Sequence, residues 1–105
     1  MDHQIDFSKM EWITPAIGVK YKTFINATQR IRLVVFSEGF VEPDWCLHGH
    51  SGLVLDGACR INFNGSIEYL QKGDVFHIET GKNDKHMVIM GKDEWIQILL
   101  FEQLI

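Results

Sequence analysis

The chain has 105 residues, 46% of them hydrophobic and 23% charged, and its formal net charge at pH 7 is −4. This length is enough for one domain with one core, so we expect residues 1–105 to form a single domain. The acidic balance and the scattered basic residues argue against a nucleic-acid-binding face, and no apolar run approaches the ~20 residues that cross a bilayer. The N-terminus lacks a signal-peptide pattern, so we expect a cytoplasmic protein with no nucleic-acid or membrane partner, whose cysteines, Cys46 and Cys59, stay reduced.

Residues 1–17 are expected to form an N-terminal arm that packs on the remaining domain, residues 18–105, or on a second subunit. After this arm the chain consists of short apolar-rich segments separated by turn residues, a pattern typical of β-strands. Asn64 and Gly65 both tolerate positive φ, as the type I′ turn of a tight hairpin requires. The expected strands lie at 19–25, 30–36, 45–50, 53–56, 58–63, 66–70, 75–78, 85–90 and 95–101.

The spacing of these segments predicts an all-β domain. Strands recur at intervals of ~8–12 residues and leave no room for crossover helices, so antiparallel pairing in a sandwich or barrel of about eight strands is expected. Within the segment 30–36, Ile31, Leu33 and Val35 share one face, and Arg30 and Arg32 lie on the other.

The five histidines fall into two groups. His3 and His77 are expected at the surface. His48 and His50 lie two residues apart, and on a strand such side chains point to the same face, about 7 Å apart at the backbone. Two imidazoles in this arrangement could converge on one metal ion at ~2.0–2.2 Å per bond, with the small Gly49 between them. The alternative is a pair of histidines hydrogen-bonded to backbone or water.

Two stretches of the chain resemble the conserved motifs of the cupins. Residues 45–57 contain the HxH pair, an apolar strand and the Val-Leu-x-Gly turn of the first motif, and residues 73–81 contain the Gly-Asp and apolar strand of the second. The resemblance covers roughly residues 30–102. It implies a cupin fold, an antiparallel jelly-roll barrel that is also described as a double-stranded β-helix.

The resemblance also implies a metal centre. It places His48, His50 and His86 in the positions that hold a divalent ion, which could be Zn, Fe, Mn, Ni or Cu. The sequence departs from the cupin pattern because no glutamate follows His50, Glu79 replaces a proline, and Met90 stands where an asparagine is expected. The missing glutamate leaves the fourth ligand open.

Several residues are candidates for that position and for the surrounding pocket. Asp44 and Cys46 have the strand parity of the histidines, Gln97 could approach from the last strand, and water is a further alternative. For Cys46 the competing interpretation is simple packing in the barrel. Met90, Gln97 and Phe36 are expected to line the pocket.

Three functions are compatible with this pattern. The first is a metal-dependent enzyme acting on a small organic molecule, as a dioxygenase, an isomerase or a hydrolytic enzyme. The second is a non-catalytic module that binds a small ligand or senses a metal. The third is a metal-free barrel in which the histidines form a hydrogen-bonded cluster. The resemblance further implies a homodimer, because small cupins commonly dimerise.

Overall fold

The computed structural model describes residues 3–104. Eight strands form in this part of the chain, and all their pairings are antiparallel. The strands are β1 (Ile13–Ala16), β2 (Val19–Ile25), β3 (Gln29–Ser37), β4 (His50–Phe63), β5 (Ser66–Gln71), β6 (Val75–Ile78), β7 (His86–Ile89) and β8 (Trp95–Gln103). Two single turns of 3-10 helix also form: η1 (Phe7–Lys9) precedes β1, and η2 (Lys82–Asp84) lies between β6 and β7. Among these residues no helix has the length and apolar character needed to cross a membrane.

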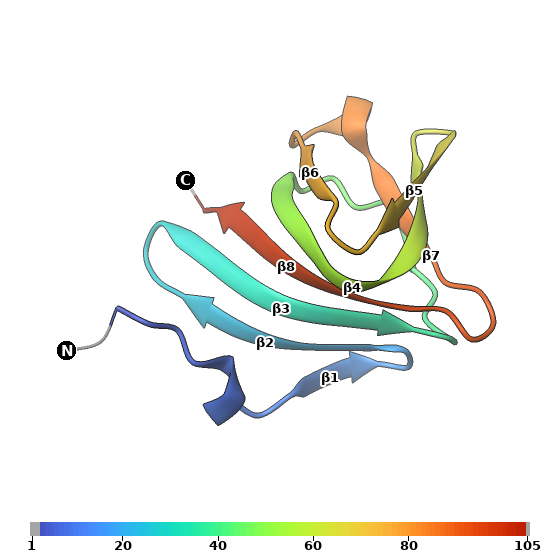
Figure 1. Ribbon diagram of the computed structural model, residues 1–105. Coiled ribbons are helices and arrows are strands. Elements are labelled where there is room, and N and C mark those ends of the chain that lie inside the picture. The colour runs from blue at the N-terminus through green and yellow to red at the C-terminus, as the bar shows by residue number, and fades with distance from the viewer. Residues whose placement is uncertain (1–2, 105) are drawn as a thin grey trace.

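The long strand β4 organises the sheet. The strand order is β1-β2-β3-β8-β4-β5, and β6 and β7 also pair with β4. The first part of β4 pairs with β6 and β8, and its second part pairs with β5 and β7. An irregularity between Val54 and Asp56, followed by Gly57 at a φ of 77°, bends β4 between these two parts. The sheet therefore curls, so that β5, β6 and β7 lie above β2, β3 and β8 (Figure 1).

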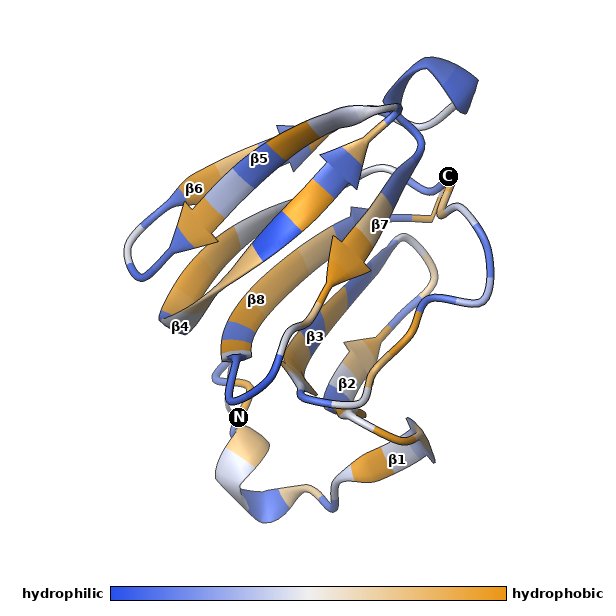
Figure 2. Ribbon diagram, turned by 90° about the vertical axis from the view of Figure 1, so that its right-hand side faces the viewer, coloured by the Kyte–Doolittle hydropathy of each residue, from blue (hydrophilic) through white to orange (hydrophobic). Residues whose placement is uncertain are grey.

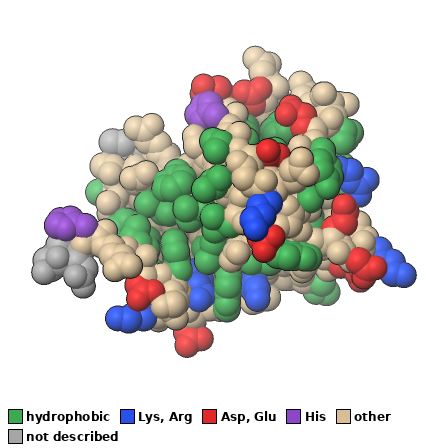
Figure 3. Space-filling model, viewed as in Figure 1, with side chains coloured by type: hydrophobic (Ala, Val, Ile, Leu, Met, Phe, Trp, Pro, Cys, Tyr) green, Lys and Arg blue, Asp and Glu red, His purple; other side chains and the backbone are tan. Residues whose placement is uncertain are grey.

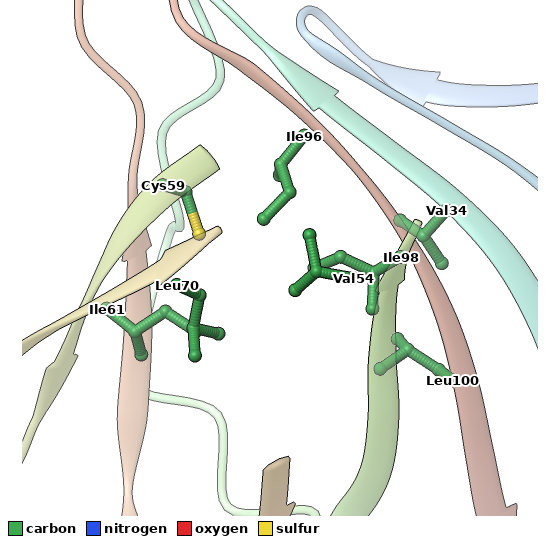
Figure 4. Packing of buried hydrophobic residues seen from close by; sticks show 8 residues of the cluster. All are labelled: Val34, Val54, Cys59, Ile61, Leu70, Ile96, Ile98 and Leu100. Atoms are coloured by element: carbon green, nitrogen blue, oxygen red, sulfur yellow. The ribbon is translucent and has the colours of Figure 1, made fainter. Parts of the chain in front are cut away.

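The hydrophobic core lies inside this curl. Figure 4 shows its side chains pointing toward one another from β3, β4, β5 and β8. Strand β8 is hydrophobic over most of its length, whereas hydrophobic and hydrophilic residues are interspersed along β4 (Figure 2). The core residues are Val34, Val54, Cys59, Ile61, Leu70, Ile96, Ile98 and Leu100.

Much of the expected strand pattern is confirmed. The fold is all-β and antiparallel, and β2 and β6 have the expected bounds. Asn64 and Gly65 connect β4 to β5 with φ values of 51° and 101°, as the predicted tight turn requires. Within the expected N-terminal arm, Ile13–Ala16 forms β1 and pairs with β2 of the same chain.

Two expectations about the strands are wrong, and the ends of β3, β5, β7 and β8 differ from the expected ends by one or two residues. The segment 45–50 is not a strand, because β4 begins only at His50 and Cys46 makes an isolated bridge to His86. Gly49 lies so close to the end of β6 that a Cβ there would collide with the Ile78 carbonyl group, and its N–H donates to Thr80 Oγ1 at 2.9 Å. The segments 53–56 and 58–63 are one continuous strand, since the irregularity near Gly57 bends β4 without ending it.

Candidate ligand-binding cavity

The curled sheet encloses a cavity of about 320 Å³. Its lining is mostly apolar and comes from β1, β2, β3, β4, β6, β7, β8 and the loop before β4. Such a volume is at the lower end of the ~300–1,000 Å³ typical of small-molecule sites. Five charged, histidine or cysteine side chains also reach it, namely Arg32, Glu42, Cys46, His50 and His86.

His86 and Cys46 form one polar group in the cavity wall. Their backbones are joined by two hydrogen bonds, with Cys46 N donating to His86 O at 2.9 Å and His86 N donating to Cys46 O at 3.1 Å. His86 is only 3% exposed, and its Nδ1 lies 3.0 Å from the carbonyl oxygen of Asp84. A carbonyl oxygen only accepts, so Nδ1 carries the proton and donates, and Nε2 is the nitrogen of the neutral ring that can accept a hydrogen bond.

The side chains of Cys46 and His86 also form a hydrogen bond, which affects the pKa values of both residues. The hydrogen bond with His86 lowers the pKa of the Cys46 thiol, and this effect exceeds the opposing effect of burial. Burial lowers the pKa of His86, but the hydrogen bonds with Cys46 and Asp84 outweigh it, so the pKa of His86 is raised. The two side chains therefore favour a charged thiolate–imidazolium arrangement more than isolated groups would.

Glu42 lies beside this pair. Burial raises the pKa of its carboxyl group, and the N–H of Val88 and the charge of His86 only partly oppose the shift. Val88 N donates to Glu42 Oε1 over a long 3.5 Å. Glu42 thus adds a carboxyl group with increased affinity for a proton to the part of the cavity near His86.

His50 has a different character. Burial is the main cause that lowers its pKa to about 4, so its imidazole is neutral at pH 7. Its ring centroid lies 5.3 Å from that of His86 in an edge-to-face arrangement. The Nδ1 atom of His50 is buried and has no hydrogen-bond partner. The site therefore contains a neutral imidazole with an unsatisfied polar atom.

A buried ionic cluster lies near His50, and the sequence analysis did not find it. Glu102 on β8 is 5% exposed and accepts hydrogen bonds from Arg30 and Arg32 on β3. The face of β3 that carries these arginines, together with Val34 and Phe36, is the inner face of the sheet. The sequence pattern that indicates its burial is the alternation along β8, where Glu102 shares the face of Ile96, Ile98 and Leu100.

The structure does not bring the three predicted metal ligands together. His50 and His86 line the cavity, whereas His48 is exposed and lies outside the lining, because it precedes β4. Within residues 3–104, no three His, Cys, Asp or Glu side chains are placed so that they could hold a metal ion. The residues therefore do not fit the three-histidine centre that the resemblance implied, and we derive no chemistry through it.

The remaining predicted site residues are divided between the cavity and other places. Cys46 and Phe36 line the cavity. Asp44 is exposed, and Met90 packs against the core without being part of the lining. Gln97 alternates with the buried Ile96 and Ile98, so it lies on the outer face of β8.

His77 lies at the surface, as predicted. Its ring nitrogens are 2.7 Å from Ser51 Oγ and 3.1 Å from Glu79 Oε1. The exposed position of His77 keeps it out of the cavity lining.

Comparison with solved structures identifies this architecture. The chain superposes on an RmlC-like cupin from Shewanella frigidimarina NCIMB 400 with a TM-score of 0.76 and 18% identity, over 98% of this chain and 91% of the other. The fold is that of a cupin. Two further cupin-like matches are KdgF from Halomonas sp. (TM-score 0.76, 21% identity, 97% of this chain, 94% of the other) and the polyketide cyclase RemF from Streptomyces resistomycificus (TM-score 0.82, 16% identity, 98% of this chain, 80% of the other).

The similarity is one of structure. No family model matches the sequence, and no curated protein matches it either. At these identities the matches establish the cupin fold, as the two motifs predicted, and leave the function to be argued from the cavity itself.

Proposed function

We propose that this cupin binds a small, largely apolar organic molecule inside its barrel. The observation that carries the proposal is the cavity of about 320 Å³, with mainly apolar walls and a few polar groups that converge on it. This combination is the usual form of a small-molecule site, in which apolar walls supply affinity and the polar groups fix orientation.

The aromatic side chains of the wall suit a flat or ring-shaped ligand. Phe36, Phe40 and Phe76 all contribute to the lining, and Phe36 and Phe40 pack with ring centroids 4.8 Å apart. Aromatic rings offer large contact areas and prefer offset or tilted contacts with other rings. RemF is named as a polyketide cyclase, but 16% identity transfers its fold and not its activity to this chain.

A cavity-filling variant tests the proposal. Val88 lines the cavity, so Val88→Phe is expected to reduce or abolish the binding of aromatic probes such as 2-naphthalenemethanol and 2-naphthoate, measured by titration calorimetry. Val75→Phe is the matched control, since Val75 is 77% exposed and outside the cavity lining. Failure of both probes to bind the wild type, or equal affinity in Val88→Phe, would refute the proposal.

Binding of a divalent ion is the second candidate function. Its support is the unpartnered Nδ1 of His50 and the nearby ring of His86, two imidazoles that could share an ion such as Zn, Fe, Mn, Ni or Cu. Elemental analysis of untagged protein tests this candidate, and unchanged metal content in His86→Ala would contradict the ligand assignment.

A homodimer remains our proposal for the assembly. Leu33, Leu99 and Phe101 alternate with residues of the inner face, so they lie on the outer face of β3 and β8, where Phe101 is 38% exposed. A group of hydrophobic side chains also reaches the surface in Figure 3. Light scattering is expected to give twice the 12.2 kDa chain mass, and a monomer at micromolar concentration would contradict this proposal.

A further inference from the structure

The inner face of the sheet carries charge beside the cavity. Arg30 and Arg32 on β3 are in register with Glu102 and Leu100 on β8, respectively. On the neighbouring strand β4, Gly52 is in register with Leu100, and His50 lies two residues before it. The strand pairing therefore gathers two guanidinium groups, one carboxylate and one imidazole on one part of the inner face.

The charges in this cluster do not cancel. Arg30 donates to Glu102 from Nε at 3.3 Å and from Nη2 at 2.7 Å, and Arg32 donates to the same carboxylate from Nη2. Two guanidinium groups thus share a single carboxylate. The other acid in the cavity lining, Glu42, lies beside Val88 and His86 instead. One positive charge in the cluster is left without a counter-charge.

Polar atoms in the same region also lack partners. Arg32 Nε is buried and has no hydrogen-bond acceptor. The hydroxyl group of Thr23, which is in register with Arg32 on the neighbouring strand β2, is also buried without a hydrogen-bond partner. His50 Nδ1 is the third such atom, and these three are the buried side-chain nitrogen and oxygen atoms without a partner among the described residues. Buried donors that remain unpaired are rare and call for an explanation.

A bound anion would both balance the extra positive charge of the cluster and accept a hydrogen bond from the unpaired Nε of Arg32. Arg32 lines the cavity, and its guanidinium group stacks 5.7 Å from the ring centroid of Tyr21, another lining residue. A guanidinium held in this way keeps its fork of donors in a fixed plane, which matches the two oxygens of a carboxylate. The adjoining wall at Val34 and Phe36 is apolar.

We infer that the cavity selects a small organic carboxylate, whose carboxylate group binds Arg32 beside His50 and whose apolar body packs against Val34, Phe36 and Phe76. This inference rests on the proposed function, since it names the class of ligand for the same cavity. It requires no metal ion, because the positive charge comes from the protein.

A matched pair of probes tests the inference. 2-Naphthoate and 2-naphthalenemethanol have the same ring system, and only the first carries a charge at pH 7. Calorimetric titration of the full chain in EDTA is expected to show at least about tenfold tighter binding of 2-naphthoate, as a charge-assisted hydrogen bond gives. Equal affinity for the two probes would overturn the inference and leave the proposed function standing, whereas no binding of either would overturn both.

Arg32→Met is the decisive variant. It removes the unpaired donor but leaves Arg30 bound to Glu102, and it is expected to erase the preference for 2-naphthoate while neutral binding persists. Arg60→Met is the matched control, because Arg60 pairs with Glu94 outside the cavity lining, and it should keep the preference. A preference that survives Arg32→Met, or one that appears only when EDTA is omitted, would refute the assignment.

A measurement on the wild type covers the case in which Arg32→Met does not fold. The Arg32 Nε–H signal in nitrogen-edited NMR spectra is expected to shift with 2-naphthoate and to stay in place with 2-naphthalenemethanol. An unchanged signal at saturating 2-naphthoate would refute contact between the carboxylate and Arg32.

Discussion

The substitution Glu102→Gln tests whether the buried ionic cluster stabilises the barrel. Each charge-assisted hydrogen bond that Glu102 accepts is worth roughly 1.5–3 kcal/mol, and breaking a fully buried pair costs about 3–5 kcal/mol. The side chains of Arg30 and Arg32 are 34% and 22% exposed, so water recovers part of their solvation in the variant. We therefore expect a loss of about 2–3 kcal/mol in the free energy of unfolding, or roughly 10–20 °C in Tm for a domain of this size.

The pH dependence of this loss identifies its electrostatic origin. Burial on its own would raise the pKa of the Glu102 carboxyl, but the hydrogen bonds and charges of Arg30 and Arg32 together lower it below the ordinary value of 4.5. A lowered pKa in the folded state contributes stability above the ordinary pKa, and this contribution is lost as the pH falls through the folded-state pKa. The difference between wild type and Glu102→Gln should therefore be largest near pH 7 and shrink below pH 4.5.

Urea denaturation followed by tryptophan fluorescence from pH 7 to pH 3 measures this difference. The matched control is Glu79→Gln, whose side chain is 76% exposed and, among the described residues, forms a hydrogen bond or ion pair only with the surface residue His77. This control should change stability by less than about 0.5 kcal/mol. A loss below about 1 kcal/mol at pH 7 for Glu102→Gln, or a loss that stays constant down to pH 3, would refute the reasoning.

Three further predictions concern the core and the cavity wall. Iodoacetamide at pH 7.5 should alkylate Cys46 well before Cys59. The pKa of the Cys46 thiol is lowered, whereas Cys59 is 0% exposed and burial raises its pKa to about 12. Equal alkylation rates by mass spectrometry would contradict this. Gly52→Ala should cost about 1–3 kcal/mol, since the new methyl group overlaps the Phe76 ring, and an unchanged urea midpoint would show that Phe76 moves freely. Ile96→Ala should cost about 2–5 kcal/mol because Ile96 is fully buried, and a loss under 1 kcal/mol by calorimetry would place Ile96 outside the core.

The strand pattern could be predicted from the sequence because local signals determine it. Alternating apolar residues and turn residues gave β2 and β6 their bounds, and Asn64-Gly65 marked its hairpin. The bend in β4 could not be predicted in the same way, since a glycine inside an apolar run is compatible with either a strand break or a bulge. The segment 45–50 is apolar-rich like the true strands, which is why the sequence predicts a strand there, whereas its path depends on contacts between Gly49 and the distant end of β6.

The site was only partly predictable for a related reason. The motif resemblance brought His50 and His86 to the cavity, but the argument from strand parity for His48 failed once the strand was found to begin at His50. On β3 the outer residues such as Leu33 are as apolar as the inner ones, so alternation alone could not show that Arg32 faces inward. Only the pairing of β3 with β8 reveals which face is enclosed.

The cluster on the inner face links stability to selectivity. Glu102 holds both arginines inside the barrel, yet with one carboxylate for two guanidinium groups it leaves the donor of Arg32 unsatisfied. A second buried acid would complete the cluster and remove its ability to bind an anion. A ligand carboxylate that takes this place at one hundred times its Kd adds about 2.7 kcal/mol to the folded state, similar to what Glu102 is expected to contribute. The barrel thus tolerates an incomplete ionic cluster because the missing partner is the ligand itself.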